Sequence, residues 1–298
     1  MAIRISTARL AAAVAKAGGI GVIAGSGLEP AELRSEIEAA RRLSGGRGII
    51  GVNIMYAVRQ FADLVRAAFD AGIDLLISGA GFSRDMFGWG EAAGIPVVPI
   101  VGSAKLAKFS AALGADAVVV EGNEAGGHLG TDRSVQELLP EVRAAVDIPV
   151  VAAGGIVDAA DAARAFDMGA DGVQLGIRFA ATPEANGADA LKQCYLNAGR
   201  EDIVVIRSPV GMPGRAIRNQ LTDDLAAGRA PDPENCNDCL KRCSGWFCVR
   251  EALCLAQQGD VDRGLIFSGD RVDKIREILP ARQIIEDLVA GLRRARGG

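Results

Sequence analysis

The single histidine of the chain, His128, is the residue best suited to move protons near neutral pH. It ends a glycine-rich segment, Glu121-Gly-Asn-Glu-Ala-Gly-Gly-His128, which follows a short apolar run. A neutral imidazole can accept or donate a proton, which suits removal of an α-proton or protonation of a carbanion. Gly126 and Gly127 leave room beside the ring for a flat ligand. A histidine in a surface loop is the alternative, but the position after a buried run favours catalysis.

Glycines follow the last two apolar runs of the first half of the chain. Gly154 and Gly155 end the run PVVAAGG, and Gly176 follows GVQL. Backbone N–H groups without a side chain beside them bind phosphate well where a helix begins. These three glycines are therefore candidates for a phosphate site, with tight turns alone as the alternative.

Polar side chains also lie in or at the end of apolar runs. Asn53 ends one run, Ser78 ends another, and Gln174 lies within the last. A buried amide without a hydrogen-bond partner costs about 1–3 kcal/mol, so Gln174 needs a partner from a ligand or from the neighbouring backbone. For Ser78, an ordinary turn residue is an equally good interpretation.

Five of the six cysteines lie between residues 236 and 254. The spacing is Cys236-x2-Cys239-x3-Cys243-x4-Cys248, and Cys254 follows within a helical pattern. In a reducing compartment such a group indicates a metal site before disulfides. Three close thiolates plus a fourth suit a [4Fe–4S] cluster better than zinc, whose structural sites usually pair two separated CxxC knuckles. Cys248 and Cys254 compete as the fourth ligand, and unligated thiols are the remaining alternative.

The elements that would position these residues alternate along the chain. Apolar, β-branched runs without polar alternation are typical of parallel strands buried on both faces. Helical patterns separate them, and repeated β–α units predict right-handed crossovers and a parallel sheet. The predicted strands are 19–25, 49–54, 74–80, 96–101, 117–122, 149–155 and 172–179. The predicted helices are 7–16, 30–43, 57–71, 103–113, 134–146, 159–168, 184–198 and 272–294.

Seven strands are visible, whereas a (β/α)₈ TIM barrel has eight, so an open doubly wound sheet is a competitor. Even spacing of the units and glycine turns after the last two strands favour the barrel. We therefore expect an α/β TIM barrel whose first strand is missing at the N-terminus, with a small C-terminal cap that carries the cysteines. The expected organisation is a barrel core at 1–199, a cap at 200–264 and a C-terminal helix at 265–298 that packs back on the barrel.

Composition excludes several classes of protein. Hydrophobic residues make up 49% and charged residues 23% of the chain, which is an ordinary globular balance. The net charge is −4 and no basic stripe is present, which argues against nucleic acid as a partner. No apolar run reaches the ~18 residues of a membrane span, and no secretory signal opens the chain. We expect a cytoplasmic protein that acts on a small molecule, and the apolar C-terminal helix favours a homodimer.

The segment from Met1 to about Phe179 resembles the nitronate monooxygenase (2-nitropropane dioxygenase) family, which includes the FMN-dependent enoyl-acyl-carrier-protein reductases. The matching motifs are LAAAVAKAGGIGVI, GVNIM, SGAG, VVVEGNEAGGHLG, PVVAAGGI and GVQLGIRF. The resemblance implies an FMN-dependent TIM barrel in which His128 is the catalytic base or proton donor. It also implies a set of flavin contacts, namely Met1, Ala2, Asn53, Glu121, Gly154, Gly155, Gln174, Leu175 and Gly176.

Two features depart from the family pattern. Family members begin with a strand that ends in Pro-Met, and Met1 aligns with that methionine, so the first barrel strand is absent. The cysteine group is not typical of simple members. Its CxxCxxxC spacing is similar to the iron–sulfur segment of 2,4-dienoyl-CoA reductase-like enzymes, and that likeness implies a one-electron relay to FMN.

The leading functional prediction is an FMN-dependent oxidoreductase that resembles nitronate monooxygenase. The alternative within the same chemistry is an enoyl-thioester reductase (acyl-carrier-protein or CoA) that takes its electrons from NAD(P)H. A phosphate-binding barrel lyase or isomerase without flavin is an alternative of another class. An iron–sulfur regulatory protein on a degenerate barrel is a further one.

Overall fold

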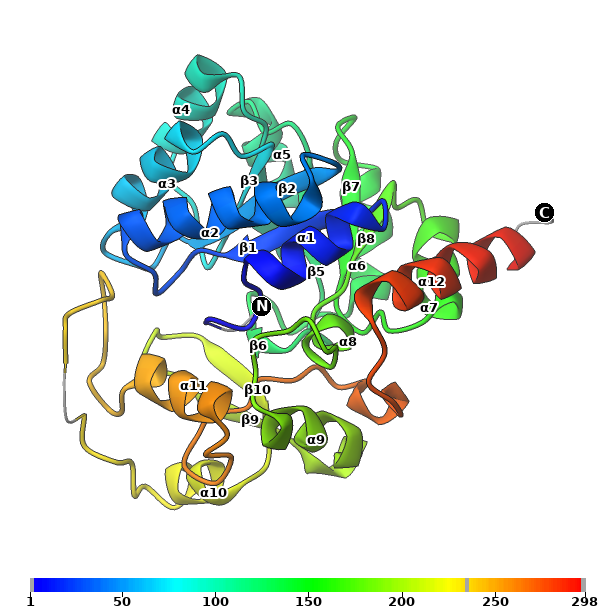
Figure 1. Cartoon of the computed structure of the whole chain (residues 1–298). Helices are drawn as coiled ribbons and strands as arrows, with labels where there is room; N and C mark the ends of the chain where they lie inside the picture. The colour runs from blue at the N-terminus through cyan, green and yellow to red at the C-terminus, as the bar shows by residue number, and fades with distance from the viewer. Residues whose placement is uncertain (1–2, 234–235, 296–298) are drawn as a thin grey trace.

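A parallel sheet forms the centre of the protein. The computed structural model describes residues 3–233 and 236–295. Seven parallel strands occur in the order β1-β2-β3-β4-β5-β7-β8 and curl into an incomplete barrel (Figure 1). Their bounds are β1 (Ile20–Ala24), β2 (Ile49–Met55), β3 (Leu75–Gly79), β4 (Val97–Val101), β5 (Val118–Glu121), β7 (Val150–Ala153) and β8 (Gly172–Gln174). All seven predicted strands are present. The last is shorter than predicted, because Gly176 leads into the short helix α8 (Ile177–Ala180).

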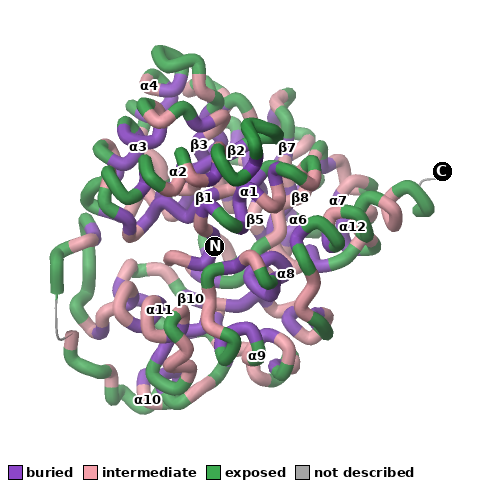
Figure 2. Tube along the Cα trace, viewed as in Figure 1, coloured by how far each residue is buried: buried purple, intermediate pink, exposed green. Residues whose placement is uncertain are grey.

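The strands are buried on both faces, as their apolar runs predicted. Along β3, Leu76 packs outward among the helices, whereas Ile77 packs inward against Val98, Val119 and Ala153 of neighbouring strands. Figure 2 shows this buried centre, with exposed residues on the outer helices. The helices of the outer layer are α1 (Ala8–Lys16), α2 (Pro30–Ser44), α3 (Phe61–Asp70), α4 (Asp85–Ala93), α5 (Ala104–Ala112), α6 (Val135–Arg143), α7 (Ala159–Asp167) and α12 (Ala281–Ala295).

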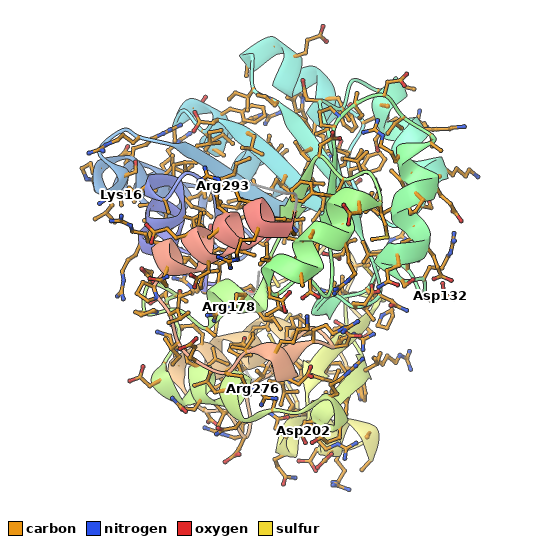
Figure 3. All side chains as sticks on the ribbon, turned by 90° about the vertical axis from the view of Figure 1, so that its right-hand side faces the viewer. Lys16, Asp132, Arg178, Asp202, Arg276 and Arg293 are labelled. Carbon is orange, nitrogen blue, oxygen red and sulfur yellow. The ribbon has the colours of Figure 1, made fainter. Side chains whose placement is uncertain are left out.

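The helical layer closes more completely than the sheet. Strands β1 and β8 are the two edges, and no strand within residues 3–233 and 236–295 pairs between them. Helix α12 nevertheless packs against both α7 and α1, and Figure 3 shows it beside α7. The prediction of a barrel that lacks its first strand is therefore confirmed.

A second, smaller layer covers the barrel at the carboxyl ends of its strands. It contains a three-stranded antiparallel sheet in the order β6-β10-β9, in which β6 (Gly127–His128) comes from the barrel half. The other strands are β9 (Ile203–Arg207) and β10 (Pro213–Ile217), and the helices are α9 (Asp189–Asn197), α10 (Gln220–Ala226) and α11 (Val249–Gln258). The short 3₁₀ turns are η1 (Arg200–Asp202) and η2 (Val272–Lys274). We refer to residues 200–264 as the cap; the domain boundaries stay predictions.

A second connection joins the cap to the barrel beside α3. Arg59 donates its backbone N–H to the Cys239 carbonyl at 2.9 Å, and Lys241 donates to the Ala57 carbonyl at 2.9 Å. The Arg59 guanidinium also contacts the Asp238 carboxylate at 2.6 Å. This pairing explains why α3 begins at Phe61 and not at the predicted residue 57.

The predicted start of the C-terminal helix is wrong. Residues 272–274 form η2, and α12 begins only at Ala281, after Pro280. Proline disfavours helical geometry in the residue before it, so the helix cannot extend back through this position. Buried Arg178 of α8 donates to the Glu277 carbonyl at 3.1 Å in the intervening segment, and Figure 3 shows its side chain between the barrel and the cap.

No helix in the part of the chain that the structure describes is both long and apolar enough to cross a bilayer.

We predict that Gly21→Ala destabilises the protein, because a Cβ at this position would lie 1.9 Å from the Ala11 carbonyl oxygen. Overpacking of this kind costs about 1–3 kcal/mol or more. The matched control is Gly88→Ala on the exposed side of α4, where nothing lies within 4 Å of the added Cβ. Alanine is a better helix former than glycine, so this variant should be stabilised by about 0.5–1 kcal/mol. Urea denaturation of the two variants tests the pair, and equal midpoints would contradict the packing of α1 on β1.

Candidate functional site

A cavity of about 380 Å³ lies between the carboxyl ends of the barrel strands and the cap. From the strand ends it is lined by Asn53, Glu121, Gly154, Gly155, Gln174 and Gly176, and His128 lies in its wall. From the cap and the segment after it, the lining includes Val210, Cys239, Arg250, Leu253, Phe267 and Arg271. Catalytic residues of parallel α/β barrels lie at this end of the strands.

The structure brings most of the predicted site residues together, although their roles stay predictions. Leu175 is not among them, because it packs in the hydrophobic core and does not line the cavity. Met1 and Ala2 lie outside the described residues. Ser78 is fully buried and does not line the cavity, and its hydroxyl has no hydrogen-bond partner in the part of the chain that the structure describes.

His128 is held by several contacts at once. Its backbone belongs to β6, opposite Gly214 of β10. The imidazole Nε2 lies 2.8 Å from the Ser208 hydroxyl, and the Phe267 ring meets it edge to face at 5.1 Å between centroids. Burial lowers the pKa of His128 to about 4, so the ring is neutral at pH 7. A neutral imidazole in a cavity wall can donate or accept one proton.

The loop that leads from β5 to His128 is fixed on both sides. The Glu124 carboxylate accepts the N–H of Val135 at 2.9 Å, at the start of α6. The Asn123 carbonyl accepts a hydrogen bond from the Arg215 guanidinium of β10 at 2.6 Å. The histidine therefore does not lie on a free surface loop, which was the alternative interpretation of its sequence context.

The glycines after β7 and β8 form an open backbone surface in the cavity wall. Gly154 and Gly155 both adopt positive φ, +102° and +66°, which favours glycine at both positions. A Cβ on Gly155 would lie 3.1 Å from the Glu124 side chain, whereas one on Gly176 would meet nothing within 4 Å. The short helix α8 begins directly after Gly176, so its first N–H groups also lie at this side of the cavity.

Three polar side chains in the cavity wall are suited to a bound ligand. The amides of Asn53 and Gln174 line the cavity and make no side-chain hydrogen bond within residues 3–233 and 236–295. Glu121 faces the cavity, but the protein around it removes it from bulk water, and this desolvation raises its pKa to about 7. A ring system with donors and acceptors along its edge would satisfy these groups.

Four residues of the site were not predicted as such from the sequence. They are Ser208 beside His128, Phe267 against its ring, Tyr195 on α9 and Arg271 beside Gly155. Burial raises the pKa of Tyr195 above its ordinary value, so its hydroxyl keeps its proton. The Arg271 Nε is buried and lies 3.8 Å from the Asp270 carboxylate as an ion pair, but it has no hydrogen-bond partner among the described residues. These residues come from distant parts of the chain, and no local motif marks them.

The predicted metal centre is not supported. Among residues 3–233 and 236–295, no group of three or more His, Cys, Asp or Glu side chains could hold a metal ion. The Cys248 thiol instead accepts the Glu251 N–H at 3.4 Å and caps α11, and Cys239 lies in the cavity wall. Cys236 and Cys243 are exposed on the loop before α11, and Cys254 is on α11 itself. Close spacing in the sequence allows the thiols to lie near one another, but the path of the loop does not bring three of them to one point.

A parallel barrel with a capped cavity and a half-buried histidine at the carboxyl ends of its strands has the layout of a barrel enzyme. The sequence profile of the family described as nitronate monooxygenase matches residues 1–74 and 50–291. The chain belongs to this family.

Relatives of the chain include oxidoreductases of different names. A dehydrogenase of Rhodococcus jostii, (3aS,4S,5R,7aS)-5-hydroxy-7a-methyl-1-oxo-octahydro-1H-indene-4-carboxyl-CoA dehydrogenase, is 38% identical over 217 residues, which cover 73% of this chain and 61% of the relative. FabK from Thermotoga maritima has 31% identity and a TM-score of 0.87 over 99% of this chain and 91% of its own. Nitroalkane oxidase from Streptomyces ansochromogenes has 27% identity and a TM-score of 0.84, over 99% and 94%. The chain spans about three fifths of the length of the curated dehydrogenase.

We predict that His128 stays neutral down to about pH 5, because burial lowers its pKa from 6.5 to about 4. The unfolded chain binds this proton near its ordinary pKa, so the free energy of unfolding should fall as pH decreases through the window from about 6.5 to 4. NMR titration of the protein with ¹⁵N-labelled histidine gives a single set of ring signals, since the chain has one histidine. A ring that titrates near 6.5 in the folded protein would contradict its burial.

Proposed function

We propose that the protein is an FMN-dependent oxidoreductase that acts on a small molecule of the nitronate class, with His128 as the proton-transfer residue. The observation that supports this most directly is convergence within one cavity. A neutral histidine, a glycine surface at the ends of β7 and β8, and two amides that make no side-chain hydrogen bond among the described residues all line it. Family membership and the likeness to nitroalkane oxidase point to the same chemistry.

The residues present fit a flavin mononucleotide. The backbone at Gly154, Gly155 and Gly176 suits the phosphate, since barrel enzymes bind phosphate after their last two strands. Arg271 would add a positive charge beside Gly155. Asn53 and Gln174 would meet the polar edges of the ring system. When bound, FMN would supply the hydride or single-electron chemistry that amino-acid side chains lack.

The protein's part in the reaction is proton control and exclusion of water. The neutral His128 ring can take the α-proton of a nitroalkane, or donate a hydrogen bond to a nitronate that arrives already ionised. Phe267 and the cap shield the ring from solvent, and this desolvation keeps it uncharged until it reacts. Glu121 has a pKa of about 7, so at neutral pH its carboxyl group can either take up or release a proton.

A second candidate is an NAD(P)H-dependent reductase of enoyl thioesters. Its support is the similarity to FabK and to the CoA-ester dehydrogenase. The cavity is large enough to extend from the glycine surface towards an apolar side lined by Leu28, Val58, Leu64, Val249 and Leu253. An acyl chain would fit such a surface. In this reaction His128 would protonate the α-carbon of the substrate.

We expect His128→Ala to retain FMN but to lower turnover by ~10²–10⁴-fold, the usual contribution of a general acid or base. His128→Gln is the matched control for cavity volume, since it keeps a polar side chain of similar length that cannot titrate. Both variants should lose turnover to a similar degree. Flavin content and steady-state rates measure the two effects separately, and unchanged turnover in both would remove His128 from the mechanism.

Anaerobic flavin spectra should separate the two candidate reactions. Bleaching of the flavin band by an alkyl nitronate without NAD(P)H is the result expected for the proposed function. Bleaching by NADH or NADPH alone, followed by reoxidation with an enoyl thioester, would support the reductase. A colourless protein that takes up no FMN would overturn both and favour a phosphate-binding barrel without flavin.

A further inference from the structure

The Ser208 hydroxyl lies where it can control the ring of His128. Ser208 follows β9 and is 3% exposed. Its carbonyl accepts the Gly211 N–H at 3.0 Å, and its own N–H donates to the Met212 carbonyl at 3.3 Å, so the turn between β9 and β10 fixes its backbone. The hydroxyl oxygen lies 2.8 Å from Nε2 of His128. The contact therefore joins two segments that are already held together by β6 and β10.

The hydrogen bonds around this hydroxyl indicate the direction of its proton. The Ser208 oxygen already accepts the Val210 N–H at 3.4 Å. The hydroxyl proton needs an acceptor of its own, because a buried donor without a partner is unfavourable. Within residues 3–233 and 236–295, the other polar atom at hydrogen-bond distance from this hydroxyl is Nε2 of His128, which can accept when the ring carries its proton on Nδ1. The serine is thus arranged to donate to the ring.

A neutral imidazole carries one proton, so the nitrogen that accepts a hydrogen bond leaves the other as the donor. Burial lowers the pKa of His128 to about 4, and the neutral ring is the relevant form at pH 7. Nδ1 makes no hydrogen bond to any residue that the structure describes, although His128 lines the cavity. The Phe267 ring, at an interplanar angle of 73°, packs against the imidazole and restricts its rotation.

We propose that Ser208 is a positioning residue that donates to Nε2 and holds His128 as the tautomer protonated on Nδ1, so that Nδ1–H meets the ligand in the cavity. The catalytic meaning of this tautomer rests on the proposed function of His128. In this state the ring presents a donor to an anionic oxygen or to a carbon that gains a proton. To act as a base at Nδ1, the ring needs its proton on Nε2 and a Ser208 hydroxyl that has turned to accept it.

The tautomer can be read directly, because the chain has one histidine. Long-range ¹H–¹⁵N correlation spectra of the ¹⁵N-histidine-labelled protein, with and without FMN, should show the proton on Nδ1. Ser208→Ala should shift the population towards the Nε2-protonated form. Ser208→Thr keeps the hydroxyl and should restore the Nδ1-protonated form. Ser110→Ala is the matched control, since Ser110 is also fully buried but lies on α5 away from the cavity, and it should change nothing.

Kinetics give a second readout. Ser208→Ala should lower kcat by roughly 2- to 13-fold, the factor that corresponds to the net free energy of one hydrogen bond, with a smaller change in KM. Ser208→Thr should recover most of this loss. A wild-type ring protonated on Nε2, or a Ser208→Ala spectrum identical to that of the wild type, would overturn the proposal. If the proposed function were wrong, the result would be different: His128→Ala would leave turnover unchanged, while the NMR spectra would still show the ring protonated on Nδ1.

Discussion

The pairing of β6 with β10 is the contact on which the site depends. Two residues of the barrel half, Gly127 and His128, join a sheet that otherwise belongs to the cap. This short ladder places the imidazole between the strand ends and the cap, against Ser208 and Phe267. Without it, the segment after β5 would be an ordinary βα loop. The cap thus forms one wall of the cavity and also holds the backbone of the histidine.

Burial then determines the chemistry of the groups that face the cavity. Desolvation disfavours the charged form of any titratable group, so it acts in opposite directions on acids and bases. It raises the pKa of Glu121 to about 7 and lowers that of His128 to about 4. At pH 7 His128 is therefore neutral, whereas Glu121 is divided between its neutral and its ionised form. A cavity wall with little fixed charge at these two positions suits a ligand that brings its own charge or develops one during the reaction.

The parallel sheet could be predicted because its physical signal is local. Each strand is buried on both faces, so each appears as a continuous apolar run. All seven runs contain a strand, and six of them end within two residues of the predicted bounds, whereas the last stops at Gln174. The strands of the cap sheet were missed, because β6 has two residues and β9 and β10 are partly exposed. The predicted metal centre is not supported among the described residues, for a related reason. Sequence spacing limits how far apart two thiols can be, but the backbone path of the loop and the start of α11 determine where each one points.

The histidine illustrates the division between sequence and tertiary structure. The sequence by itself determined that one imidazole follows an apolar strand in a glycine-rich segment, and its motifs determined the family. These are properties of neighbouring residues, which covalent spacing and local burial control. Only the tertiary structure decided that Ser208, 80 positions later in the chain, lies at hydrogen-bond distance from Nε2, and that Phe267 packs on the ring. Such contacts depend on the pairing of β6 with β10 of the cap sheet, and no local pattern of residues predicts that pairing.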